Sequence, residues 1–275
     1  MMERLEEKSE LVMDTFENVS KDWEETAFKV LVRSFGFKRN KTGFTELSEL
    51  LSFKTIKKVC NDREDVEALL FGLAGFLQGK RKKNPYFESL KSKYEILKLK
   101  SGNENELNPV IWKFFRLRPA NFPTLRIAQL ATLIYNTDHL LSIMLGLDSI
   151  ESIEKFVKHP LGDYWHEHYN FSDEKAKGVS EIGQSSVESI AINAIVPIWF
   201  AFGKRHADDR YFERSLRLLE SISAENNKIT RYWKNLGFEN ASAFESQALI
   251  QLFNTYCLNR NCLKCNVGVT LVREF

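Results

Sequence analysis

The sequence has 275 residues, of which 12% are aromatic, and its formal net charge is +2. This length is enough for one large domain or two smaller ones, and the small net charge gives no global argument for a nucleic-acid partner. Phe is abundant (21 residues), whereas Gly (13) and Pro (6) are scarce. This profile favours long helices with short loops and argues against a turn-rich β fold.

Charge is unevenly distributed along the chain. Residues 1–26 carry nine acidic and three basic side chains, whereas residues 79–118 carry eleven basic and four acidic side chains. The second segment begins with a run of four cations at 80–83. A local excess of positive charge indicates a surface that attracts anions.

The N-terminal segment lacks the basic and apolar regions of a secretion signal. The longest apolar stretch, 190–202, contains Asn193 and Pro197 and is shorter than the ~20 residues of a membrane span. Four cysteines are too few for a disulfide scaffold in a chain of this length. We therefore expect a cytoplasmic protein without a membrane partner.

Helical signals begin near the N-terminus. Asp22 and Glu25 have the spacing of a capping box, and apolar residues follow at helical intervals until Gly36. A second apolar stripe covers 66–77 and contains Gly72 and Gly75. These glycines predict a close approach between two helices.

The clearest break is the polar segment 101–109, "SGNENELNP". It predicts two helical subdomains, 1–100 and 110–275. Further helices are expected at 85–99, 124–135, 139–147, 149–158, 184–202, 209–221, 228–236 and 242–258. Alternation typical of a strand is weak and confined to the tail "NVGVTLVREF". The predicted fold is all-α, an irregular multi-helix bundle.

Four stretches carry a resemblance to a known family: "EALLFGLAGFL" (67–77), "RLRPANFPTLRIAQLATLI" (116–134), "SIAINAIVPIWFAFG" (189–203) and "ESQALIQLFNTYCLNRNCLKCNVG" (245–268). With these motifs the chain resembles a bacterial family described only as a domain of unknown function. The resemblance runs over essentially the whole chain. It implies that longer members carry an additional N-terminal region, but it implies no activity.

Three of the four cysteines, Cys257, Cys262 and Cys265, lie within nine residues. This C-x4-C-x2-C spacing offers three soft ligands for a structural zinc ion, whose fourth ligand would have to come from Cys60 or a distant histidine. The competing interpretation is that Cys257 continues an apolar stripe and is a small buried hydrophobic residue.

The segment "WKFFRLRPANFPTLR" interleaves arginines with aromatic residues. Guanidinium groups bind phosphate and aromatic rings stack on unpaired bases. We therefore predict a nucleic-acid or anion-binding site here, and its members are Arg116, Arg118, Arg126, Trp112 and, from the preceding basic run, Lys82. The alternative is that the arginines anchor a buried turn and the rings fill the core.

Two further segments offer candidate pocket residues. In "DYWHEHYNF" (163–171), His166 and His168 together with nearby carboxylates suggest a metal or acid–base cluster. Packing of the same rings against helices is the alternative. In the helix 184–202, Asn193 lies among apolar residues. We expect it to be bonded to a neighbouring helix or to line a pocket.

The sequence has no GxGxxG, Walker A, HExxH or GxSxG motif, which argues against a nucleotide-dependent enzyme or a typical hydrolase. Our leading hypothesis is a helical binding module that contacts nucleic acid or a partner protein through its basic Arg/aromatic region. The alternatives are a metal-dependent hydrolase and a structural scaffold for an N-terminal region that this chain lacks.

Overall fold

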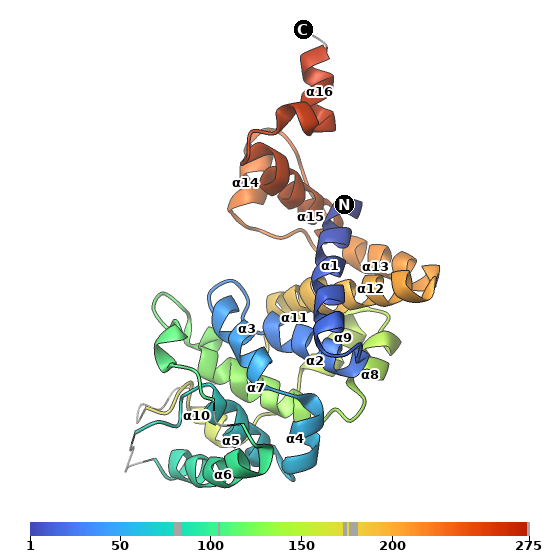
Figure 1. Cartoon of the computed structure of the whole chain (residues 1–275). Helices are drawn as coiled ribbons and strands as arrows, with labels where there is room; N and C mark the ends of the chain where they lie inside the picture. The colour runs from blue at the N-terminus through green and yellow to red at the C-terminus, as the bar shows by residue number, and fades with distance from the viewer. Residues whose placement is uncertain (80–83, 104, 173–174, 176–180, 274–275) are drawn as a thin grey trace. The chain divides into compact units, whose positions relative to one another are not determined.

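The computed structural model describes residues 1–79, 84–103, 105–172, 175 and 181–273. These residues form helices and connecting loops (Figure 1), with no β-strand among them and a single isolated bridge between Ser223 and Ser242. The predicted all-α fold is therefore confirmed. The tail "NVGVTLVREF" is helical through Arg273, so the weak strand signal there was misleading.

The chain divides into two compact units. The larger unit is Asp14–Ile195, and the smaller unit combines Met1–Met13 with Val196–Phe275. The polar segment 101–109 lies inside the larger unit, where it follows a long helix. The division into subdomains at this segment stays a prediction.

In the larger unit α1 (Met2–Asn18) contributes only its C-terminal end, from Asp14 onwards, and the chain then forms a succession of helices. They are α2 (Trp23–Ser34), α3 (Lys41–Leu50), α4 (Phe53–Val59), α5 (Arg63–Leu73), α6 (Pro85–Ser101), the short 3-10 helices Pro109–Ile111 and Pro119–Asn121, α7 (Pro123–Tyr135), α8 (Leu140–Gly146), α9 (Ile150–Val157), α10 (Tyr164–Glu167), α11 (Gln184–Ile190) and a π-helical turn, Ala191–Ile195. Every residue of α7 from Pro123 to Ile134 is buried. A helix that is buried all round forms the centre of a core.

Helix α2 connects its neighbours through two adjacent carboxylates. Glu24 accepts hydrogen bonds from the Leu140 and Leu141 N–H groups at 2.6 and 3.0 Å, and thereby caps α8. Glu25 accepts from the Phe53 and Lys54 N–H groups, both at 3.0 Å, and caps α4. Both carboxylates bind otherwise unpaired donors of a helix N-terminus.

The predicted capping box is therefore only half present. Asp22 does cap α2, since it accepts from the Glu24 and Glu25 N–H groups. The Glu25 side chain, however, is directed to α4 and does not return to its own helix start. A buried carboxylate is stabilised more by two main-chain donors and the Ser52 hydroxyl than by one solvent-exposed bond within its own helix.

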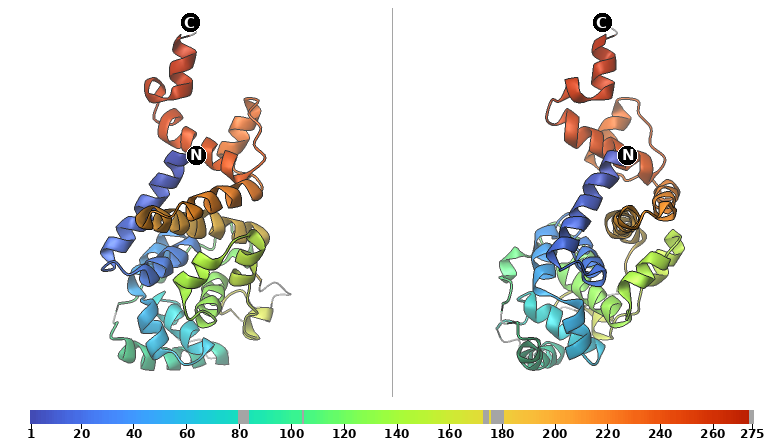
Figure 2. Two further views of the ribbon diagram at one scale, coloured as in Figure 1. Left: turned by 90° about the vertical axis from the view of Figure 1, so that its right-hand side faces the viewer. Right: turned by 45° about the vertical axis from the view of Figure 1, so that its right-hand side comes forward.

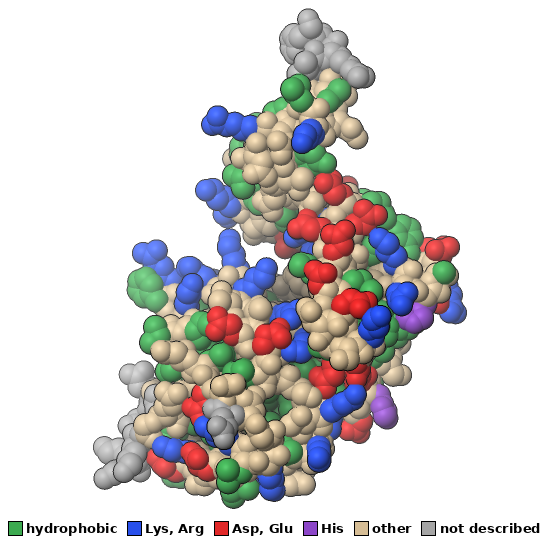
Figure 3. Space-filling view, viewed as in Figure 1, with side chains coloured by type: hydrophobic (Ala, Val, Ile, Leu, Met, Phe, Trp, Pro, Cys, Tyr) green, Lys and Arg blue, Asp and Glu red, His purple; other side chains and the backbone are tan. Residues whose placement is uncertain are grey.

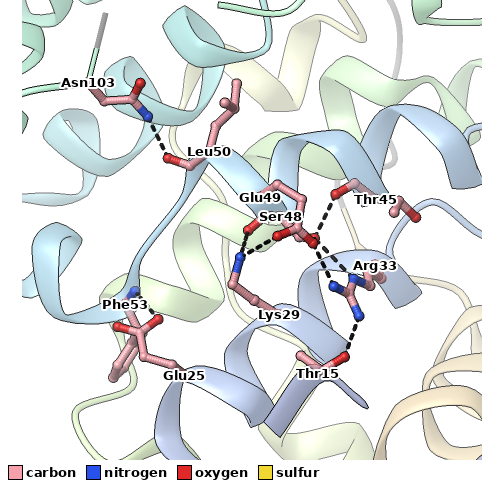
Figure 4. Close-up of polar contacts among 10 residues, drawn as sticks. All are labelled: Thr15, Glu25, Lys29, Arg33, Thr45, Ser48, Glu49, Leu50, Phe53 and Asn103. Carbon is pink, nitrogen blue, oxygen red and sulfur yellow. Dashed lines mark hydrogen bonds and ion pairs between the residues drawn. The ribbon is translucent and has the colours of Figure 1, made fainter. Parts of the chain in front are cut away.

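Two cations on α2 bind α3 (Figure 4). Lys29 donates to Glu49 Oε2 and to the Ser48 carbonyl, both at 2.8 Å. Arg33 donates to Glu49 Oε1 at 2.6 Å, and also to the Ser48 hydroxyl and the Thr15 hydroxyl. Partial burial raises the pKa of Glu49, but the hydrogen bonds from Lys29 and Arg33 outweigh this effect and leave it lowered.

Helices α5 and α6 lie side by side (Figures 1 and 2). A methyl group at Gly72 would lie 2.1 Å from Cδ2 of Tyr94 on α6, so the close approach predicted for this glycine is confirmed. Gly75 lies just beyond α5 with a φ of +77°, and there it faces the Leu107 carbonyl. Its role is therefore to end the helix.

We predict that Gly72→Ala lowers the free energy of unfolding by about 1–3 kcal/mol, because the new methyl group overlaps the Tyr94 ring. The ring is held in place by a hydrogen bond from its hydroxyl to Glu106. Urea denaturation measures the change. The control is Gly146→Ala, where a methyl group meets no atom within 4 Å, and this variant should be at least as stable as the wild type.

The smaller unit contains the first part of α1 followed by the C-terminal helices. These are α12 (Val196–His206), α13 (Asp209–Ser221), α14 (Lys228–Asn235), α15 (Ala243–Leu252) with a π-helical turn Phe253–Cys257, a 3-10 helix Cys262–Lys264, and α16 (Asn266–Arg273). Arg4 binds α15 by donating to Gln247 and Gln251 at 3.1 and 3.3 Å. These bonds join the two ends of the sequence.

Gln184–His206 is one continuous helical run of 23 residues, long and apolar enough to cross a membrane by length and composition alone. Of its most apolar window 72% is buried inside the structure. The core helix of a soluble protein passes the same test, so this is weak evidence for a span. The π turn Ala191–Ile195 ends two residues before Pro197, whose ring and missing N–H disturb regular α-helical hydrogen bonding.

Candidate anion-binding surface

Two segments of the larger unit contain cations and no carboxylate. Residues 26–45 contain five Lys or Arg, and residues 107–137 contain four, without a single Asp or Glu in either segment. The first segment includes the loop between α2 and α3, and the second includes the loop that leads to α7. Positive charge in these loops has no acidic residue nearby in the sequence to neutralise it.

Asn40 joins the two loops. Its side-chain N–H donates to the Lys113 carbonyl at 3.1 Å, and its side-chain oxygen accepts from the Lys113 N–H at 2.8 Å. The amide is buried, with 5% of its surface exposed. This two-way bond between residues 73 positions apart fixes the loops against each other.

Six cations flank this bond, and we name them the basic surface: Lys38, Arg39, Lys41, Lys113, Arg116 and Arg118. All six are exposed. None of them forms an ion pair with another residue of the described part of the chain. Lys and Arg side chains gather over α3 and the loop before α7 (Figure 3). Such unpaired, clustered cations create a positive potential that attracts anions.

The loop before α7 presents an aromatic side chain beside these cations. A turn closed by the bond from the Leu117 N–H to the Phe114 carbonyl places Phe115 and Arg116 at its corner. Phe114 packs edge-on against Phe76 and Phe122. Phe115 points the other way and is 79% exposed, with the Arg116 guanidinium 5.1 Å from its ring centroid.

Arg116 has a φ of +61°, the left-handed conformation that favours glycine. An L-residue there costs roughly 1–2 kcal/mol. A cation is thus kept at a corner where glycine would be more stable. Strain of this kind is typical of functional loops.

Arg126, on α7, lies beneath this surface and is buried. Its guanidinium donates to Gln129, Asn121 and Ser186 at 2.6–2.9 Å and lies 4.6 Å from the ring centroid of Phe37. Burial lowers its pKa to about 10, so it stays charged at neutral pH. Its bonds connect α7 with the loop before it and with α11, which is the anchoring role named as the alternative.

Trp112 is also part of the core. It stacks on Phe76, meets Phe44 edge-on, and donates its indole N–H to the Ala74 carbonyl at 2.8 Å. Only 5% of its surface is exposed, so no ring face is open to a base.

The residues predicted to form one anion site therefore do not lie together on one surface. Arg116 and Arg118 belong to the basic surface, Arg126 and Trp112 are buried, and Lys82 lies outside the described residues. Sequence reasoning missed Lys38, Arg39 and Lys41, which come from a loop far away in the sequence, and gave Lys113 no role. The signal that would have found the first three is the 20-residue segment without a carboxylate.

We predict that Arg116→Gly and Arg118→Gly change stability in opposite directions. Glycine relieves the strain at Arg116, whereas at Arg118, whose φ is −67°, it only adds freedom to the unfolded chain. The free energies of unfolding should differ by about 1 kcal/mol in favour of Arg116→Gly. Equal destabilisation in thermal or urea denaturation would show that the corner is unstrained.

The histidine segment 163–171 packs as its aromatic content suggests. Trp165 and Phe171 are buried against Phe71, with ring centroids 5.4 and 4.9 Å away. His168 stacks on Tyr164 at 4.1 Å, and its Nδ1 lies 3.0 Å from the Tyr164 carbonyl.

The two candidate histidines of this segment are not brought together around a ligand position. His166 is exposed, and the carboxylate between the histidines, Glu167, pairs with Lys175. In the described residues no three His, Cys, Asp or Glu side chains are placed to hold a metal ion.

A buried carboxylate lies in the same region. Glu67 on α5 has no exposed surface and accepts a hydrogen bond from the Tyr86 hydroxyl. Burial raises its pKa to about 8, against the opposing effect of Arg63, whose Nε lies 3.7 Å from Glu67 Oε1. Glu67 is therefore largely protonated at neutral pH.

We predict that this carboxyl group makes folding stability fall with rising pH. The folded protein holds the Glu67 proton more tightly than the unfolded chain, so this contribution is fully present below about pH 4.5. It decreases between there and about pH 8, the raised pKa. Glu67→Gln should remove this part of the pH dependence, measured as the free energy of unfolding from pH 5 to pH 9. An unchanged slope in the variant would contradict the assignment.

Asn193 forms hydrogen bonds within its own helical run, and its bond to a neighbouring helix stays a prediction. It is exposed, and it donates to the Ser189 carbonyl and hydroxyl, one turn earlier in its own helical run. Asn193 lies in the π turn, whose wider helical spacing places its side chain away from the side of the helix that its buried neighbours occupy.

The three clustered cysteines lie in the smaller unit, between α15 and α16. Cys257 and Cys262 are exposed and Cys265 is buried, so the interpretation of Cys257 as a buried hydrophobic residue was wrong. Partial burial and the neighbouring Cys265 and Cys262 thiols raise the pKa of Cys257. They are not arranged as a metal site within the described chain, and zinc binding stays a prediction.

Comparison with known proteins supplies a family. Residues 1–228 match the family described as "Protein of unknown function (DUF2851)". The chain belongs to the DUF2851 family. Comparison with curated proteins and with solved structures gave no match.

The DUF2851 match covers the larger unit completely. Both loops of the basic surface and the Asn40 bond between them therefore lie inside the matched residues. The cysteines at 257–265 lie beyond them.

Proposed function

We propose that this DUF2851 protein is a helical binding module whose basic surface binds the phosphate backbone of nucleic acid. The observation that carries the proposal is the set of six exposed cations without carboxylate partners, on two loops that Asn40 joins. Unpaired cations release condensed counterions when they meet a phosphate chain, and this supplies the affinity.

The start of α3 adds to the attraction. Asn40 occupies its N-cap position but makes no side-chain cap, because the side chain is bonded to Lys113. The first N–H groups of α3 therefore donate no hydrogen bond to the Asn40 side chain. Main-chain donors at a helix N-terminus bind phosphate oxygens and reinforce neighbouring cations.

The arrangement fits a polyanion better than a single small anion. The cations are distributed over two loops, and neither of the segments 26–45 and 107–137 contains a carboxylate. Contacts to phosphates position a nucleic acid without reading its sequence. We therefore expect binding with little sequence preference and strong salt dependence.

We predict that the double variant Arg116→Ala/Arg118→Ala weakens nucleic-acid binding and lowers its salt dependence. Two lost phosphate contacts should reduce the slope of log K against log salt by about 1.4 for a single strand or 1.8 for a duplex. Fluorescence anisotropy with labelled oligonucleotides between 50 and 200 mM salt measures this slope.

The matched control is Arg205→Ala/Arg217→Ala, which removes the same charge from exposed positions on α12 and α13. It should leave the slope unchanged. Equal losses in both variants would mean that overall charge, and not the basic surface, drives binding. Absence of binding by the wild type at 50 mM salt would refute the proposed function.

A further inference from the structure

We infer that the basic surface selects single-stranded over double-stranded nucleic acid, and that Phe115 makes the selection by stacking on an unpaired base. The inference rests on the proposed function and adds the class of nucleic acid. Its basis is the position of one exposed aromatic ring within a group of cations.

Exposure of Phe115 is built into the loop. Phe114 is fixed between the rings of Phe76 and Phe122, and the turn that follows directs the next side chain outwards. Phe115 keeps 79% of its surface exposed. A large ring so exposed gains little for folding, so its burial is available to a ligand.

The neighbours of Phe115 are the groups that a single strand needs. Its own loop supplies Lys113, Arg116 and Arg118, all exposed, and the Arg116 guanidinium lies 5.1 Å from the ring centroid. A base stacked on the ring would place its phosphates within reach of these cations. Single-strand binding sites combine base stacking with backbone neutralisation in this way.

A duplex cannot use the ring in the same way. Its bases are stacked on one another and offer no open face, so it meets only the cations. The salt-dependent attraction is thus common to both ligands, while the stacking contribution belongs to the single strand alone.

The test compares a labelled 20-nucleotide oligo(dT) with a mixed-sequence 20-base-pair duplex in anisotropy titrations at fixed salt. Phe115→Ala should weaken single-strand binding about tenfold, since one stacked base is worth of the order of tenfold in affinity. Duplex binding should change less than twofold.

Two variants serve as controls. Phe115→Trp keeps a stacking surface and should retain single-strand affinity, with quenching of the new indole fluorescence by oligo(dT). Val110→Ala removes a non-aromatic side chain that is 84% exposed just before the loop, and it should bind like the wild type.

The outcomes separate the two claims. If single strand and duplex bind equally and Phe115→Ala affects neither, the inference fails while phosphate-backbone binding stands. If the wild type binds neither ligand at low salt, the proposed function itself fails. A tenfold loss confined to the single strand supports both.

Discussion

The arrangement of the larger unit depends on the polar face of α2. Glu24 and Glu25 each satisfy two N–H groups at the start of another helix, α8 and α4. One turn and two turns later, Lys29 and Arg33 both bind Glu49 on α3. A single helix thus aligns three others, because donors at a buried helix start must be paired.

This network also determines which Lys and Arg side chains remain without a carboxylate partner. Glu49 is the acidic residue of α3 that faces α2, and Lys29 and Arg33 together occupy both of its oxygens. Lys38, Arg39 and Lys41 follow on the same stretch of chain, and no carboxylate of the described residues pairs with them. Within this stretch the cations of α2 itself stabilise the fold, whereas those of the following loop are exposed and form half of the basic surface.

Local patterns predicted the helices well because apolar periodicity and capping act within a few residues. α13 begins and ends as expected, and Gly72 packs against α6 as its place in an apolar stripe suggested. Bonds between residues far apart in the sequence carry no such local signature. The Glu25 carboxylate fitted a local capping box, yet its partners are 28 and 29 residues away. Nothing in the sequence around Asn40 indicated that it would bond to Lys113, 73 positions away.

The same limit explains why the candidate site was only partly predicted. Arginines and aromatic residues alternate between 112 and 126, and this composition fits both a buried turn and an exposed binding loop. The structure contains both, since Trp112 and Arg126 are buried whereas Phe115 and Arg116 form the exposed corner. Only the fold determines which side chains of such a segment face solvent.

The extent of the family match bears on where a shared activity resides. The DUF2851 match ends at residue 228, before the cysteine cluster, and includes every residue of the basic surface. An activity common to the family must rest on groups within the matched residues. The basic surface meets this condition, and it also has exposed cations, an exposed ring and a strained corner that folding alone does not require. The cysteines at 257–265 lie outside the matched residues, so an activity common to the family does not rest on them.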